Sequence, residues 1–508
     1  MREGGLEPPR PNGHQHLKLA RLPIPPSAHV TFLADLPTHD NSTHSGRPEY
    51  HPDFGAALDG YRWHMDSTSG GVGDELQALD ATAVIARDLI RFDTSNYGEG
   101  KSNGEADAAH YLEAKLATMG LSPQLFESEP GRVTVVARVT GRAGTATADA
   151  LVMHGHTDVV PADPTNWSVD PFAGVVKDGM LWGRGAVDMK NMDAMMVTAL
   201  DEILSSGREP ARDIVVAFFA DEEDGGRLGS HFMVREHPEL FRGATEAISE
   251  VGGYSITLNG QRAYLLQTGE KALVWIKLIA RGTAAHGSRV IENNAITKLA
   301  RAVATLGEQK WPITLSQTTT QLMAELARIL EKDPEEVGPD ELAIATGTAG
   351  SFIRASIRTT TNPTKMTAGY KHNVIPDYAE ALIDIRTLPG EEDAALAEVR
   401  ALIGDDIEIV VMHRDIGLET DFHGPLVDAM VASLGRHDPG APVLPYLLSG
   451  GTDNKALSLL GIKGYGFAPL KLPADLDFPG MFHGVDERVP LDALAFGRRV
   501  LSDLLLNY

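Results

Sequence analysis

Histidines and carboxylates follow apolar stretches of this 508-residue sequence in patterns that could hold metal ions. The first pattern is Met153-His154-Gly155-His156-Thr157-Asp158, directly after an apolar run. Because side chains alternate along an extended segment, His154, His156 and Asp158 share one face at the end of a predicted strand. His156 is the candidate metal ligand, since Asp158 can orient its imidazole. A lone histidine is more often a structural residue, and we favour that interpretation for His154.

A second pattern places an aspartate beside a predicted helix. It reads Trp182-Gly183-Arg184-Gly185-Ala186-Val187-Asp188-Met189-Lys190, and its glycines permit a close approach of the backbone. A carboxylate has two oxygens and can bridge two cations about 3.5–4 Å apart. Asp188 is therefore a candidate bridging ligand, and the alternative is an ordinary helix N-cap.

Four consecutive acids, Asp221-Glu222-Glu223-Asp224, follow a strongly apolar run. Such a run is usually a solvated loop. The abrupt change from a buried strand to carboxylates favours a site, because concentrated negative charge at a sheet edge is unfavourable unless cations neutralise it. Adjacent residues can then divide two roles, one binding a metal and the other acting as general base toward a water.

Glu250 and His483 complete the donor set, although each is weak evidence alone. Glu250 follows another apolar stretch, and His483 lies in Phe482-His483-Gly484 near the end of the chain. Because the sequence has no cysteine, thiolate metal sites and disulfides are excluded. The imidazoles and carboxylates together suit two zinc ions, with cobalt or manganese as alternatives.

In this order, the motifs resemble those of the co-catalytic zinc aminoacylase and carboxypeptidase family. That family includes acetylornithine deacetylase, succinyl-diaminopimelate desuccinylase, glutamate carboxypeptidase and bacterial dipeptidases. The resemblance extends from about Leu79 to Tyr508. It implies this ligand set: His156 and Glu250 on one metal ion, Glu223 and His483 on the other, and Asp188 bridging both.

The resemblance also implies roles for residues that bind no metal. Glu222 would take a proton from the attacking water, and Asp158 would be the hydrogen-bonding partner of His156. The peptide bond between Asp188 and Met189 would be cis, as in relatives.

Three residues of the middle segment match the family's lid. His286, in Ala284-Ala285-His286-Gly287-Ser288, would stabilise the oxyanion, often from the partner subunit. Asn373 and Arg386 match positions that bind the substrate carbonyl and carboxylate, and a guanidinium can pair with a carboxylate through two hydrogen bonds. Either residue could equally well hold the lid together.

Ser449-Gly450-Gly451-Thr452-Asp453 resembles the family's glycine loop under the substrate. Amides of Gly450, Gly451 and Thr452 could donate to a carboxylate there. The chain departs from the desuccinylase pattern after Thr452, and Val251 stands where many relatives have glycine. These departures argue against the biosynthetic substrates named above without affecting the metal ligands.

The elements that must position these residues follow an α/β pattern. Short apolar runs alternate with helical or loop segments, which is typical of a mostly parallel sheet with helices on both faces. We expect a zinc-peptidase-like catalytic domain with an inserted α+β lid domain. The predicted strands are 133–139, 150–153, 214–219, 274–279, 378–385 and 407–412, and the predicted helices are 80–90, 104–119, 294–306, 391–403, 425–434 and 491–506.

Four segments follow from this pattern. Residues 1–78 are rich in proline and polar residues, so we expect a disordered or wrongly assigned N-terminal extension, with Met65 as an alternative start. Residues 79–271 and 416–508 would form the catalytic domain. Residues 272–415 would form the lid and dimerisation domain, with an elaboration at about 308–363.

Composition excludes several kinds of partner. The formal net charge of −25 would repel nucleic acid and anionic lipid surfaces. No stretch approaches the roughly 18 consecutive apolar residues of a membrane span, and the N-terminus lacks a signal-peptide core. We therefore expect no nucleic-acid or membrane partner and a cytoplasmic location.

The expected function is two-metal hydrolysis of the amide bond of an N-acyl amino acid or short peptide with a free carboxylate. A homodimer through the lid domain is expected from the resemblance. A metallo-β-lactamase-type hydrolase is excluded because Val159 occupies the place of a required histidine. The alternative is a catalytically silent relative that acts as a binding or regulatory protein, and Glu222 argues against it.

Overall fold

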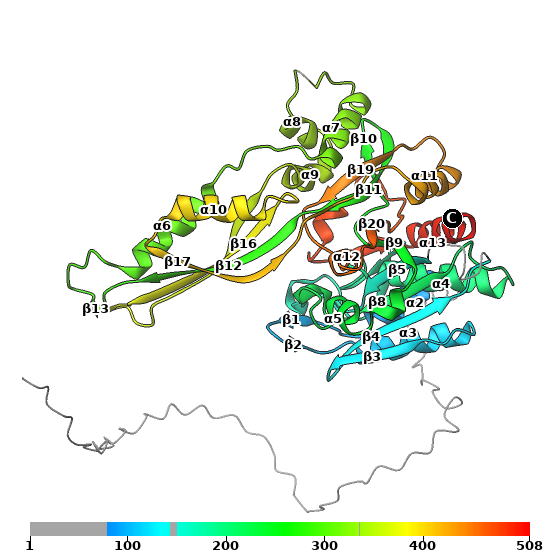
Figure 1. Cartoon of the computed structure of the whole chain (residues 1–508), viewed down its shortest axis with the longest axis horizontal. Coiled ribbons are helices and arrows are strands. Elements are labelled where there is room, and N and C mark those ends of the chain that lie inside the picture. Colours follow the sequence, from blue (N-terminus) through cyan, green and yellow to red (C-terminus); the bar gives the residue numbers. More distant parts are fainter. Residues whose placement is uncertain (1–78, 143–149, 335) are drawn as a thin grey trace, which may run out of the picture. The chain divides into compact units, whose positions relative to one another are not determined.

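The computed structural model describes residues 79–142, 150–334 and 336–508, and we analyse these residues only (Figure 1). The expectation for residues 1–78 therefore lies outside the described residues. Among the described helices, none is both long enough and apolar enough to cross a lipid bilayer.

The larger sheet has ten strands, in the order β10-β11-β20-β9-β5-β8-β4-β3, with β18 and β19 also paired to β11. It carries the strands expected at 133–139, 150–153 and 214–219. The strands are β3 (Gln124–Glu129), β4 (Arg132–Val139), β5 (Ala150–His156), β8 (Ile214–Phe219), β9 (Ala244–Ser249), β10 (Tyr254–Leu258), β11 (Gln261–Glu270), β18 (Leu418–Glu419), β19 (Val443–Leu448) and β20 (Lys463–Gly466).

The sheet is parallel at its centre and between β11 and β19, which partly confirms the expected mostly parallel arrangement. β20, β9, β5 and β8 run parallel, whereas β4 is antiparallel to β8 and β3 is antiparallel to β4. β3 and β4 are joined by Pro130 and Gly131, and so short a connection can link only antiparallel strands. The apolar run of β4 could not reveal this, because a strand buried on both faces reads alike in either direction.

Helices cover both faces of this sheet, as predicted. On one face, α4 (Lys190–Ser205) packs against β5, where Leu151 and Met153 point into the core, and α2 (Ala81–Ile90) and α13 (Leu491–Asn507) pack against α4. On the other face, α5 (Ser230–Glu236) and α12 (Asn454–Ser458) pack near Val152. The expected cap of α2 is present, since the Asp80 carboxylate accepts the amide of Thr82 at 2.9 Å.

A separate four-stranded antiparallel sheet has the order β14-β16-β12-β17. Its strands are β12 (Ala272–Arg281), β14 (Thr360–Ala368), β16 (Tyr378–Thr387) and β17 (Ile407–Asp415). α6 (Ala295–Glu308) and α10 (Glu392–Ile403) accompany it, and its core includes Val274, Leu299 and Val399. The sequence predicted these helices and three of the strands. It did not predict β14, an edge strand whose Pro363 is tolerated only at an edge or bulge.

The elaboration expected within the inserted unit packs elsewhere. It forms α7 (Gln317–Ile329), α8 (Pro339–Ile344) and α9 (Gly350–Ser356). Leu322, Leu326 and Ile353 belong to the same apolar cluster as Tyr446 of β19, so these helices extend the core of the ten-stranded sheet. The expected placement of this segment within the lid was therefore wrong.

Candidate active site

Three neighbouring parallel strands deliver acidic and imidazole side chains to one edge of the ten-stranded sheet. His156 is the last residue of β5, Glu222 and Glu223 lie in the turn after β8, and Glu250 follows β9. Because β9, β5 and β8 are parallel, their carboxyl ends meet at this edge, where open α/β sheets bind ligands.

Two loops add the remaining members of the expected ligand set. Asp188 precedes α4, and His483 follows the short helix η5 (Pro479–Met481). The Asp188 carboxylate lies 3.0 Å from His156 Nε2 through Oδ1 and 3.3 Å from His483 Nε2 through Oδ2. Glu223 lies 3.1 Å from His483 Nε2, and Glu250 lies 3.6 Å from His156 Nε2. The structure thus brings all five residues to one centre.

The donor set fits divalent cations. His156, Asp188 and Glu223 offer ligand atoms within 4.8 Å of one another, and so do His156, Glu222 and Glu250. Burial raises the pKa of Glu250, and the negative charge of Asp188 raises it further. Burial also raises the pKa of Glu222 and Glu223, again with neighbouring carboxylates adding to the effect. Oxygen and nitrogen donors that crowd in this way are the ligands that zinc and manganese take, and a cation relieves their repulsion.

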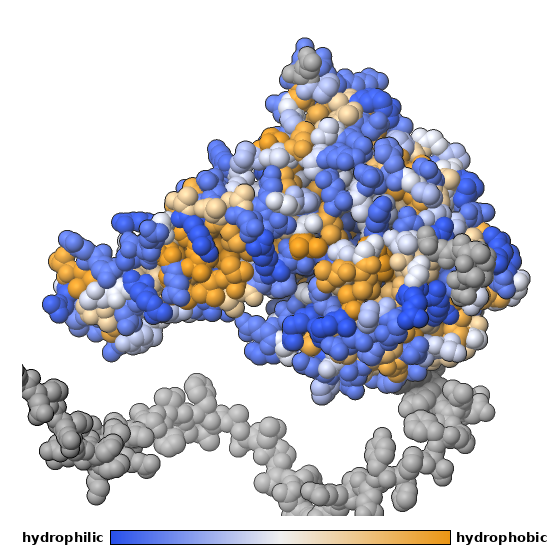
Figure 2. Space-filling view, viewed as in Figure 1, coloured by the Kyte–Doolittle hydropathy of each residue, from blue (hydrophilic) through white to orange (hydrophobic). Residues whose placement is uncertain are grey.

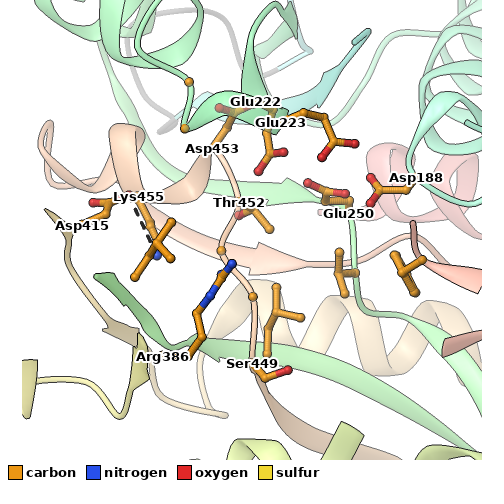
Figure 3. A pocket seen from close by; sticks show the side chains of 18 of the residues that line it. Asp188, Glu222, Glu223, Glu250, Arg386, Asp415, Ser449, Thr452, Asp453 and Lys455 are labelled. Carbon is orange, nitrogen blue, oxygen red and sulfur yellow. Dashed lines mark ion pairs between the residues drawn. The ribbon is translucent and has the colours of Figure 1, made fainter. Parts of the chain in front are cut away.

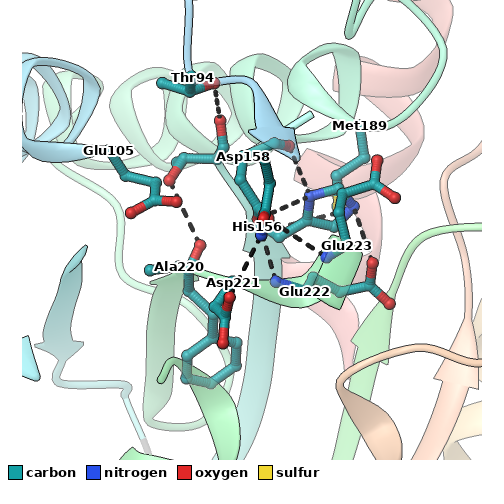
Figure 4. Close-up of polar contacts among 12 residues, drawn as sticks. Thr94, Glu105, His156, Asp158, Met189, Ala220, Asp221, Glu222 and Glu223 are labelled. Carbon is teal, nitrogen blue, oxygen red and sulfur yellow. Dashed lines mark hydrogen bonds and ion pairs between the residues drawn. The ribbon is translucent and has the colours of Figure 1, made fainter. Parts of the chain in front are cut away.

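Asp158 contacts both His156 and the turn that carries Glu222 and Glu223 (Figure 4). His156 Nδ1 lies 2.9 Å from the backbone carbonyl of Asp158 and 3.5 Å from its carboxylate, so the imidazole is oriented mainly by the carbonyl rather than by the expected carboxylate. The carboxylate accepts the backbone amides of Glu222 at 3.1 Å and Glu223 at 3.2 Å. Asp158 therefore holds the turn that presents these two glutamates.

A buried ionic network that the sequence did not reveal lies behind this turn. Arg132 of β4 contacts Asp221 at 2.7 Å and Glu105 at 3.0 Å. Asp221 has a left-handed backbone (φ 67°), which turns the chain from β8 into Glu222. Burial, with a further contribution from the negative charge of Asp158, raises the pKa of Glu105 to about 8. In the sequence, the one signal of this network was Arg132, a basic residue at the start of an apolar strand.

The raised pKa of Glu105 predicts a pH-dependent stability. Between about pH 4.5 and pH 8 the folded state keeps a proton on Glu105 that the unfolded state has lost. The free energy of unfolding therefore falls as the pH rises, and Glu105 contributes up to about 1.4 kcal/mol per pH unit to this fall. Glu105→Gln mimics the protonated acid and should remove this contribution.

Urea unfolding of wild type and Glu105→Gln across pH 5 to 9 measures the contribution of Glu105 to the free energy of unfolding. The two proteins should be nearly equal in stability at pH 5, and the variant should be the more stable at pH 8. A difference that does not change with pH would show that Glu105 is ionised throughout.

The glutamates and Asp188 face a cavity of about 550 Å³. Figure 3 shows Asp188, Glu222, Glu223 and Glu250 on one side, with Arg386 and Ser449 across from them. Of the residues expected to bind substrate, Arg386, Gly450, Gly451 and Thr452 line the cavity. The sequence did not indicate several further lining residues: Ser230, His231, Trp275, Phe352, His413, Asp415 and Lys455.

Buried charged residues contact the glycine loop. The Glu270 carboxylate accepts the amide of Thr452 at 3.0 Å and its hydroxyl at 2.6 Å. A Cβ on Gly451 would lie 2.7 Å from Lys455 Nζ, so a side chain there would displace the lysine. Arg386 donates from Nε and Nη2 to the carboxylate of Asp384 on its own strand, at 2.7 and 3.0 Å.

Two expected site residues do not join the centre. His286 lies in β13 (Ala285–His286), which pairs with β15 (Val374–Ile375) next to Asn373. His286 is exposed, and its Nδ1 lies 2.8 Å from the Ser288 hydroxyl. Neither His286 nor Asn373 is among the described residues that line the cavity. The Asp188–Met189 peptide, in contrast, is cis as the resemblance implied.

Comparisons with known proteins identify the family and the fold. The model of peptidase family M20/M25/M40 matches residues 152–507. The chain is 27% identical to N-fatty-acyl-amino acid synthase/hydrolase PM20D1 of Xenopus tropicalis, over 82% of this chain and 84% of that protein. It is 26% identical to human aminoacylase-1, over 75% of this chain and 85% of that protein. The M20 family metallo-carboxypeptidase Sso-CP2 of Sulfolobus solfataricus shares its fold (TM-score 0.65, 18% identity, 84% of this chain and 99% of that one).

Proposed function

The chain belongs to peptidase family M20/M25/M40 and is a metal-dependent amidohydrolase or peptidase, and on this premise we propose that it hydrolyses N-acyl amino acids or short peptides with a free carboxylate. The observation that carries the proposal is the cavity itself. Carboxylates line one side, and a guanidinium and the start of the glycine loop line the other (Figure 3). The names of the relatives support an acyl amino acid or a peptide as substrate.

We assign two divalent metal ions to the centre, most simply zinc, with cobalt or manganese as alternatives. His156 and Glu250 would hold one, Glu223 and His483 the other, and Asp188 both. When bound, the ions would polarise the substrate carbonyl and lower the pKa of the attacking water.

Glu222 is the proposed general base and acid. It lines the cavity, and its backbone is held by Asp158, so its carboxylate is fixed beside the donor set. Glu222 takes a proton from the water that attacks the carbonyl carbon. It returns that proton to the amine nitrogen as the carbon–nitrogen bond breaks, so no covalent enzyme intermediate is needed.

Arg386 and the loop of Gly450, Gly451 and Thr452 would bind the substrate carboxylate. Arg386 lines the cavity, and a charge-assisted hydrogen bond to a carboxylate contributes about 1.5–3 kcal/mol. A panel of N-acyl amino acids and dipeptides tests this, each assayed with a free carboxylate and as the carboxamide. The free acids should be preferred at least about 10-fold in kcat/KM. Metal-loaded protein that is inert on the whole panel would favour a binding protein instead.

We further propose a homodimer in which His286 and Asn373 serve the active site of the second copy. Both residues are absent from the lining of the described cavity. Figure 2 shows apolar surface over the four-stranded sheet, whose strands carry the exposed residues Met366, Val411 and Met412. An isologous pairing would bury such surface twice.

A further inference from the structure

One buried carboxylate gathers the loop that carries Asp188. Glu487 is fully buried and accepts the backbone amides of Val187 at 2.5 Å and Asp188 at 2.9 Å. It also accepts the amide of Gly185 at 3.2 Å and Nη1 of Arg184 at 2.7 Å. Four donors from one loop thus converge on a residue about 300 positions away.

The same ion pair reaches the turn that carries His483. Arg184 donates through its second terminal nitrogen to the carbonyl of Gly484 at 2.9 Å, directly after His483. Its guanidinium also lies over the ring of Trp167, 5.1 Å from the ring centroid. The pair of Arg184 and Glu487 therefore joins two segments that each contribute one member of the donor set.

His483 needs this support more than the other donors do. Its side chain is 55% exposed, whereas the side chains of His156 and Glu250 are 1% and 6% exposed. Its backbone is left-handed (φ 57°), which is strained for a residue with a side chain. Because more than half of the side chain is exposed, the position of the imidazole depends on how its turn is held.

We propose that Glu487 is a positioning residue which, with Arg184, sets His483 against Asp188 and so builds the half of the metal centre that contains Glu223. This inference rests on the proposed function. Partners that orient metal ligands typically contribute 10- to 100-fold to metal affinity. A purely structural ion pair would stabilise the fold and leave metal affinity unchanged.

The test is Glu487→Gln in the full chain, with zinc content counted and each affinity measured by chelator competition. The glutamine side chain keeps the shape of the glutamate but lacks its negative charge. We expect the zinc ion held by Glu223 and His483 to be weakened by about 10- to 100-fold and the ion held by His156 and Glu250 to be weakened less, with hydrolysis restored by excess zinc. If Glu487→Gln does not fold, Arg184→Lys replaces it, because lysine keeps the charge but cannot reach both Glu487 and Gly484.

Asp213→Asn is the matched control. Asp213 is also buried and accepts a backbone amide, from Gly141 at 3.0 Å, and a guanidinium, from Arg138 at 3.0 Å. It precedes β8, at the end opposite Glu222, so its loss should reduce stability without affecting zinc affinity.

Two outcomes would overturn the role of Glu487: both zinc ions bound as tightly as in wild type, or equal weakening in Asp213→Asn. A wild-type chain that binds fewer than two zinc ions would overturn the proposed function and this role together. The two failures are therefore distinguishable.

Discussion

Glu222→Gln should lower kcat by about 10²- to 10⁴-fold while both metal ions stay bound. The carboxamide keeps the size of the side chain but cannot take the proton of the attacking water. Glu222 lies 3.9 Å from His156 Nε2 and lines the cavity, so its carboxylate can reach a water at the centre. Steady-state kinetics and elemental analysis of the same preparation measure both effects.

Asp188→Asn provides the contrast for this experiment. It removes the carboxylate that lies between both imidazoles, so metal content and activity should fall together. Glu222→Gln should instead separate the two quantities. Loss of a metal ion in Glu222→Gln, or retention of more than about a tenth of wild-type kcat, would reassign the base.

His286→Ala should lower kcat by about 10²- to 10³-fold, and mixing with Glu222→Gln should restore activity. The loss is that expected for one donor to the oxyanion. If His286 acts on the second copy, a mixed dimer pairs the intact Glu222 of one chain with the intact His286 of the other. Random reassembly of equal amounts should then recover about a quarter of wild-type activity, since half the dimers hold one complete site.

Each single variant, dissociated and reassembled alone, is the control for the mixture. Sedimentation of the wild type checks the dimer directly. A monomer, or a mixture no more active than its components, would contradict action between subunits. A fully active His286→Ala would remove this residue from the mechanism.

The position of the site could be predicted from the sequence because its signals are local. His156 ends an apolar strand, Glu222 and Glu250 come within three residues of the ends of two others, and the carboxyl ends of parallel strands share one edge. The helices were predictable for a similar reason. Asp80 caps α2, and apolar residues recur along its buried face.

Contacts between distant segments could not be predicted in this way. Arg132 meets Asp221, and Glu487 meets Arg184, across 89 and 303 residues, and no local pattern records either pairing. The direction of β4 was hidden because its residues are buried on both faces. His286 was identified only by resemblance, and it lies outside the lining of the described cavity.

Anomalous diffraction from crystals of the zinc-loaded protein would locate the metal ions and identify their ligands. We expect two zinc peaks about 3.5–4 Å apart. His156 and Glu250 should ligate one, Glu223 and His483 the other, and Asp188 both, with the Glu222 carboxylate bound to neither. A single peak, or a Glu222 oxygen within ligand distance of zinc, would contradict it.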